Sequence, residues 1–155
     1  MTQPLDDGDL REMLLTALGT EHAAIWVYGL VSAFLPASTA TGLAAASLAH
    51  RERRDAVVAL LAREGIAAPP AAAAYRPPSP VTDAASAAGL AAVAEDDVAA
   101  AWRAVAERTE AATGGELRRL ALGAVTAAAT VSVTWRGLAG RTPLVASFPG
   151  DGSET

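Results

Sequence analysis

The stretch LREMLLTALGTEHAAIWVYGLVSAFL, from Leu10 to Leu35, decides the fold because its core positions recur at alternating intervals of four and three residues. The residues on this stripe are Leu10, Leu14, Ala17, Glu21, Ala24, Tyr28, Val31 and Leu35. Such a period is typical of a helix that packs against antiparallel neighbours in a bundle. Glu21 is the exception on the stripe, since an unpaired ionised carboxylate costs several kcal/mol in a bundle interior. We therefore expect other helices to supply partners for it.

Composition narrows the class of protein. A chain of 155 residues suits one domain, 1–155, with a core of useful size. Apolar residues make up 52% of the chain and aromatic residues only 5%, so the core consists largely of Ala, Val and Leu. The net charge of -5 argues against a nucleic-acid partner, which needs a basic face. The absence of Cys excludes a disulfide framework and thiolate chemistry.

Two uncharged runs raise the question of a membrane span. The run from Ala23 to Ala49 is interrupted after Leu35 by Pro36 and several hydroxyl residues. The run from Leu120 to Trp135 is shorter than the roughly 20 residues that a span needs. The N-terminal sequence is acidic where a secretory signal begins with basic residues. We therefore expect a cytoplasmic protein that does not associate with a membrane.

Periodicity and helix-ending residues predict four helices, at about 9–35, 38–64, 83–112 and 116–138. Pro36 ends the first, Gly65 the second, and Thr82 or Asp83 caps the third. The tail, 139–155, is too rich in Pro and Gly for another long helix.

The segment 65–82 is rich in proline and is expected to be a long crossover. A link of about 2 to 8 residues is usual between antiparallel bundle neighbours, so a longer one needs a reason. The second helix should be about 40 Å long, and this segment in an extended polyproline form could reach about 50 Å. It can therefore travel the length of the bundle, which would make the second and third helices parallel.

Ionisable residues occupy the middle of three predicted helices. The inward stripe of the second helix is Leu43, Ser47, His50, Arg54, Val57 and Leu61. The inward stripe of the third helix is Ala84, Ala88, Ala91, Glu95, Val98, Trp102 and Val105. The inward stripe of the fourth helix is Leu117, Ala121, Ala124, Ala128, Val131 and Trp135. Because Glu21, His50 and Glu95 each lie near the middle of a helix, they should meet at one level of the bundle. Arg54 is expected to join them, and the fourth helix to add no ligand.

Several blocks resemble a known family. They are EHAAIWVYGLVSA (residues 21–33), HRERRD (50–55), GIAAPPAAAAY (65–75) and LAAVAEDDVAAAWRAV (90–105). Together they resemble an alanine-rich bacterial family, known only as a domain of unknown function, of the ferritin-like superfamily. The resemblance implies an all-α, ferritin-like four-helix bundle with a long crossover between helices 2 and 3, and it implies no established activity.

The resemblance also allows a count of metal ligands. Ferritin-like di-iron sites use one Glu from each of two helices and a Glu-x-x-His pair from each of the other two. Glu21 and Glu95 match the single glutamates, but Ser47 stands three residues before His50 where a Glu is expected. Ala124 and Ala128 offer nothing on the fourth helix. Three of six ligands remain, so a dinuclear centre is not expected.

Two hypotheses for the site remain open. In the first, Glu21, Glu95, His50 and Arg54 form a closed, metal-free network in a protein with a structural or interaction role and no catalytic residues. In the second, Glu21, His50 and Glu95 bind a single iron, zinc or manganese ion in a metal-binding protein or metal-dependent oxidoreductase.

The remaining charged residues have simpler interpretations. Arg51, Glu52, Arg53 and Asp55 are expected on a solvated face of the second helix. Few charges lie on the first and fourth helices, which favours a homodimer. A third hypothesis, an apolar ligand bound between the alanine-rich helices, would require a cavity in the core and has no sequence motif, so the sequence identifies no small-molecule ligand.

Overall fold

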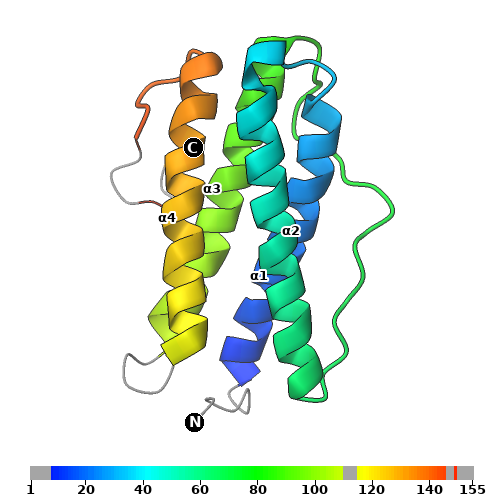
Figure 1. Ribbon diagram of the computed structural model, residues 1–155, viewed down its shortest axis with the longest axis vertical. Coiled ribbons are helices and arrows are strands. Elements are labelled where there is room, and N and C mark those ends of the chain that lie inside the picture. Colours follow the sequence, from blue (N-terminus) through cyan, green and yellow to red (C-terminus); the bar gives the residue numbers. More distant parts are fainter. Residues whose placement is uncertain (1–7, 110–114, 146–148, 150–155) are drawn as a thin grey trace.

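The computed structural model describes residues 8–109, 115–145 and 149. Over these residues the chain forms four long helices and no strand (Figure 1). They are α1 (Gly8–Val31), α2 (Ala40–Arg63), α3 (Ala84–Arg108) and α4 (Gly115–Leu138), with a short 3-10 helix, η1 (Ala37–Thr39), before α2. The predicted all-α chain with four helices is confirmed.

Two helices end earlier than the sequence suggests. α1 stops at Val31, four residues before the expected Leu35, and the N–H groups of Phe34 and Leu35 both donate to the Val31 carbonyl as the chain turns. Pro36 explains the early end, because it has no N–H to bond the Ser32 carbonyl four residues before it, and its ring would clash with that carbonyl in a continued helix. α3 stops at Arg108, and the Thr109 hydroxyl donates to the carbonyls of the last turn. The rest of the predicted third helix, 110–112, lies outside the described residues.

α3 is the central helix. It packs extensively against both α1 and α4, while α2 packs mainly against α1. α2 and α4 make only a thin contact, and a cavity of about 350 Å³ lies between them, lined by residues that include Arg53 and Arg119. Alanines on α3, among them Ala87, Ala91 and Ala99, are buried and let the neighbouring backbones approach closely.

The linker between α2 and α3 follows the long axis of the molecule. Figure 1 shows it leaving the lower end of α2 and rising beside the bundle to the upper end, where α3 begins. Tyr75 fastens it to the bundle, since its ring lies 5.9 Å from that of Trp26, centroid to centroid. Asp83 then caps α3 as predicted: its carboxylate accepts from the Ser86 N–H in a capping box. The tail is described only over 139–145 and at 149.

Among the described residues, α1 is the one helix long and apolar enough to cross a membrane by length and composition alone. In this structure 44% of its most apolar stretch is buried inside the protein. The core helix of a bundle passes the same test, so this feature by itself does not indicate a membrane protein.

Candidate functional site

The three ionisable residues predicted at mid-bundle meet in the core. Glu21 on α1, His50 on α2 and Glu95 on α3 are at most 1% exposed. His50 lies between the two carboxylates: its Nδ1 is 2.7 Å from Glu21 Oε2, and its Nε2 is 3.1 Å from Glu95 Oε1. One imidazole therefore bridges two glutamates from different helices, and both of its ring nitrogens are engaged.

The arginine of the network is Arg53, and the prediction of Arg54 was wrong. Arg53 is 9% exposed and donates from Nε to Glu21 Oε1 over 2.6 Å. Arg54 instead forms an ion pair with Asp55 at the surface, 2.8 Å long. Because positions three and four residues after His50 both lie close to its side of the helix, the sequence period does not distinguish them.

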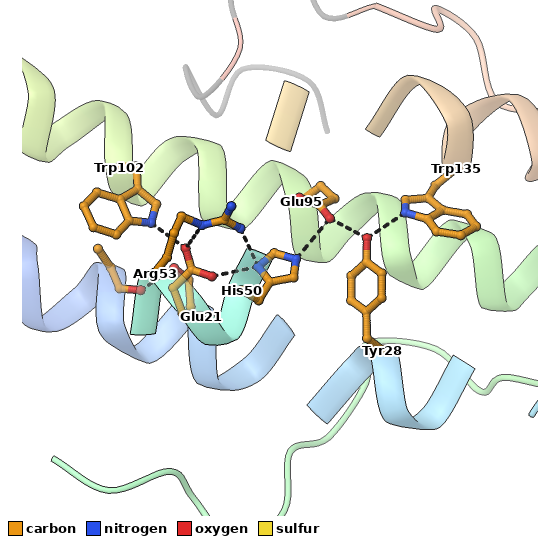
Figure 2. Close-up of polar contacts among 9 residues, drawn as sticks. Glu21, Tyr28, His50, Arg53, Glu95, Trp102 and Trp135 are labelled. Carbon is orange, nitrogen blue, oxygen red and sulfur yellow. Dashed lines mark hydrogen bonds and ion pairs between the residues drawn. The ribbon is translucent and has the colours of Figure 1, made fainter. Parts of the chain in front are cut away.

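Aromatic side chains extend the network at both ends. At one end, Trp102 donates from its indole to Glu21 Oε1 over 2.6 Å. At the other, the Tyr28 hydroxyl donates to Glu95 Oε1 and accepts from the Trp135 indole, 2.7 Å away. Figure 2 shows the resulting chain of contacts from Trp102 to Trp135. All four helices therefore contribute, and α4, which was expected to add no ligand, adds a hydrogen-bond donor, the Trp135 indole.

A sequence signal for these aromatic partners existed. Tyr28 lies seven residues after Glu21 on the predicted stripe of α1, and Trp102 lies seven residues after Glu95 on that of α3. α1 and α3 run in opposite directions (Figure 1). Each aromatic residue therefore lies level with the carboxylate of the other helix, to which it donates a hydrogen bond. Buried Tyr O–H and Trp N–H groups usually find a hydrogen-bond partner. The need of these two groups for an acceptor, together with the seven-residue spacings, predicts the observed pairs of Tyr28 with Glu95 and Trp102 with Glu21.

The charges of the network balance. Burial opposes ionisation of Glu21, but hydrogen bonds from His50 and Arg53 outweigh it and lower the pKa of Glu21. Burial likewise opposes protonation of His50, but the hydrogen bonds to Glu21 and Glu95 outweigh it and raise the pKa of His50. With His50 charged, Nδ1 donates to Glu21 and Nε2 donates to Glu95. Arg53 Nη2 also lies 2.7 Å from His50 Nδ1, and since a guanidinium can only donate, this is an approach of two cations that the carboxylates hold together. Two cations therefore face two carboxylates.

Tyr28 stays protonated within this network. Burial and the negative charge of Glu95 raise the pKa of its hydroxyl far above the ordinary value. The proton of Tyr28 is therefore held on the hydroxyl, where it donates to Glu95 and fixes the position of that carboxylate.

The donor set does not fit the dinuclear metal site of ferritin-like proteins. Ser47, which stands in the place of a ligand, is buried, and so are Ala124 and Ala128 on α4. Among the described residues, no group of three or more His, Asp and Glu side chains is arranged to hold a metal ion. His50 offers no free ring nitrogen, and the guanidinium of Arg53 brings a fixed positive charge beside Glu21. A metal ion at this place would have to displace hydrogen bonds of the network.

Comparison with known proteins gives a family and no activity. The family described as a domain of unknown function, DUF4439, matches residues 13–152. The chain is also similar to a conserved hypothetical protein, rv2844, from Mycobacterium tuberculosis, whose crystal structure is known: the two are 41% identical, with a TM-score of 0.80, over 85% of this chain and 98% of that one. No protein with a curated description matches. The chain therefore belongs to the DUF4439 family.

Proposed function

We propose that this protein is a ferritin-like bundle in which a closed charge network takes the place of a metal centre, and that its role is structural or in protein interaction. The engagement of both His50 nitrogens by carboxylates carries this proposal. The long linker beside the bundle (Figure 1) and the meeting of Glu21, His50 and Glu95 at one level of the core support kinship with ferritin-like proteins. The count of remaining ligands, three of six, supports loss of the metal.

The arrangement suits a device that fixes the packing of the helices. Each charged group has a partner on another helix, so sliding one helix against its neighbours would leave buried charges unpaired, at a cost of several kcal/mol. The same pairing leaves no group poised for acid-base work: His50 is held by two carboxylates and Tyr28 keeps its proton. No residue of the network is proposed to be catalytic.

Metal content tests the proposal. Protein purified from cells grown with added iron, zinc and manganese should contain well below one equivalent of any metal per chain. The competing hypothesis is a protein that binds a single metal ion through Glu21, His50 and Glu95, either as a metal-binding protein or as an oxidoreductase. One equivalent of metal, lost in Glu95→Ala but kept in Glu107→Ala, would establish that alternative. Glu107 is a suitable control because it is an exposed carboxylate on the same helix, paired with Arg103.

We further propose that the protein is a cytoplasmic homodimer, joined through the face of α2 and α4. Leu48 on α2 and Leu122 on α4 are 53% and 48% exposed. Each is next in sequence to a residue that lines the groove between these helices, Ala49 and Gly123 respectively. A second copy placed on this face would cover both leucines and close the seam that α2 and α4 leave open.

A further inference from the structure

A second cavity lies away from the charge network, between α1, the linker and α3. Its volume is about 150 Å³, and its lining is mainly apolar, with Ala24, Val27, Leu90 and Ala94 among its residues. Trp26 on α1 and Tyr75 in the linker form an aromatic corner, with the two rings tilted by 53°. An apolar cavity of about this size holds a molecule such as benzene. There is thus room for an apolar group of about six carbon atoms.

Two oppositely charged residues, Asp97 on α3 and Arg76 in the linker, also line the cavity. Neither makes a hydrogen bond or ion pair with another described residue. The nearest acidic neighbour, Asp96, is already engaged, because it pairs with Arg136 over 2.8 Å and accepts from Ser132. The side chains of Asp97 and Arg76 are both exposed to solvent. Partial desolvation and the charge of Asp96 still raise the pKa of Asp97, so a cation brought to this carboxylate would be favoured.

We propose that this cavity binds a small organic ammonium ion, with its apolar tail against the floor and its ammonium group between Asp97 and the aromatic corner. Trp and Tyr rings attract a desolvated cation through their faces, and a carboxylate beside them adds charge complementarity. The cavity shares none of its lining with the seven residues of the network, so this proposal does not depend on the absence of a metal.

Two kinds of ammonium compound fit this cavity, simple amines and amino acids, and they differ in whether they use Arg76. A simple amine would use Asp97 and the apolar floor alone. An amino acid with an apolar side chain would place its ammonium group at Asp97 and its carboxylate at Arg76. An apolar anion would meet Arg76 but would be repelled by Asp97.

Three probes with related skeletons separate these cases: pentylamine, norleucine, which carries an additional carboxylate, and hexanoate, which lacks the ammonium group. Titrations would be followed by NMR through the indole N–H signals of the three tryptophans. Pentylamine and norleucine should shift the signal of Trp26 and leave those of Trp102 and Trp135, inside the network, unchanged. Hexanoate should bind at least about tenfold more weakly, a difference of about 1.4 kcal/mol.

Matched variants locate the binding. Asp97→Asn should weaken pentylamine binding about tenfold, whereas Glu107→Gln, which removes the same charge from an exposed position on α3, should not. Ala23→Leu, which fills part of the cavity, should weaken binding of both amines. Arg76→Gln should weaken norleucine alone if the natural ligand is an amino acid, and neither probe if it is a simple amine. Equal binding of hexanoate and pentylamine, full binding to Asp97→Asn, or binding without a shift of Trp26 would overturn the proposal.

Discussion

Arg53 and Arg54 are neighbours in sequence, yet they are in opposite environments. Arg53 is 9% exposed and donates to buried Glu21, which also accepts from Trp102. Arg54 pairs with Asp55, whose side chain is 67% exposed. A partner removed from a buried ion pair leaves an uncompensated charge, while an exposed pair is worth little because water solvates both groups. The two arginines therefore form a matched test of the network.

Arg53→Ala should lower the free energy of unfolding by about 3–5 kcal/mol, because it leaves Glu21 buried with one cation fewer. Arg54→Ala should lower it by less than about 1 kcal/mol. Chemical denaturation of the two variants beside the wild type measures both values. Similar losses in the two variants would show that the buried ion pair does not contribute to stability as proposed.

The raised pKa of His50 makes stability depend on pH in a defined direction. Its stabilising contribution is fully present below the ordinary value of 6.5 and is lost as pH rises through the higher value of the folded protein. The lowered pKa of Glu21 acts in the opposite sense: its contribution is present above the ordinary value of 4.5 and is lost as pH falls below it. Between pH 4.5 and pH 6.5 the contributions of His50 and Glu21 to stability are both present.

The variant His50→Gln isolates the first of these effects. Its melting temperature should lie furthest below that of the wild type near pH 6, and the gap should narrow as pH rises above 6.5. Thermal unfolding at a series of pH values measures the gap. His22→Gln is the control, because His22 is the other histidine of the chain and lies outside the network. A gap that stays constant from pH 6 to alkaline pH would exclude a charged His50.

At this scale the sequence predicts part of the network. Glu21, His50 and Glu95 were predictable because charged residues on apolar stripes must find one another in a core. Arg53 was not, since the choice between two adjacent arginines depends on small rotations of α2 about its axis. Trp135 is on the predicted inward stripe of the fourth helix, but a count of metal ligands does not include an indole N–H, which needs an acceptor when buried.

At the scale of the helices, capping and helix-ending residues predict where helices begin and end more reliably than the hydrophobic period does. Asp83 caps α3 and Gly65 ends α2, as their residue types suggest. Gly65 has φ +69°, and the N–H groups of Gly65 and Ile66 donate to the carbonyls of Ala62 and Leu61. This is the Schellman arrangement, in which a residue with a Cβ is strained. The end of α1 was predicted less well, because the effect of Pro36 on the helix begins several residues before the proline itself.

Two glycine substitutions should therefore have opposite effects. Gly65→Ala should lower the free energy of unfolding by about 1–2 kcal/mol, the strain of a left-handed residue with a Cβ. Gly29→Ala should raise it by about 0.5–1 kcal/mol, because Gly29 lies within α1 with nothing within 4 Å of an added Cβ. Denaturation curves of the two variants check the signs. Destabilisation by both would mean that a new contact, and not backbone conformation, decides the outcome.

At the scale of the whole molecule, the open seam between α2 and α4 is the feature that the sequence did not predict. The stripes predict an inward face for each of the four helices, but each stripe describes one helix and says nothing about the spacing between two helices. α3 takes most of the packing of α1 and α4, and α2 is left with one extensive partner. The exposed Leu48 and Leu122 are next in sequence to Ala49 and Gly123, which line the seam that results.

If the seam is a dimer interface, opposing charges placed on it should separate the subunits. In a twofold dimer each substituted residue occurs twice on one patch, so Leu48→Glu combined with Leu122→Glu brings four like charges together. We expect the wild type to sediment as two chains of 15.6 kDa each and the double variant as one. Leu144→Glu combined with Val145→Glu is the control, because these residues are 46% and 63% exposed on the segment after α4. A monomeric wild type would exclude this face as a dimer interface. Dissociation of the control variant would exclude it as well, since only charge placed at the interface should separate the subunits.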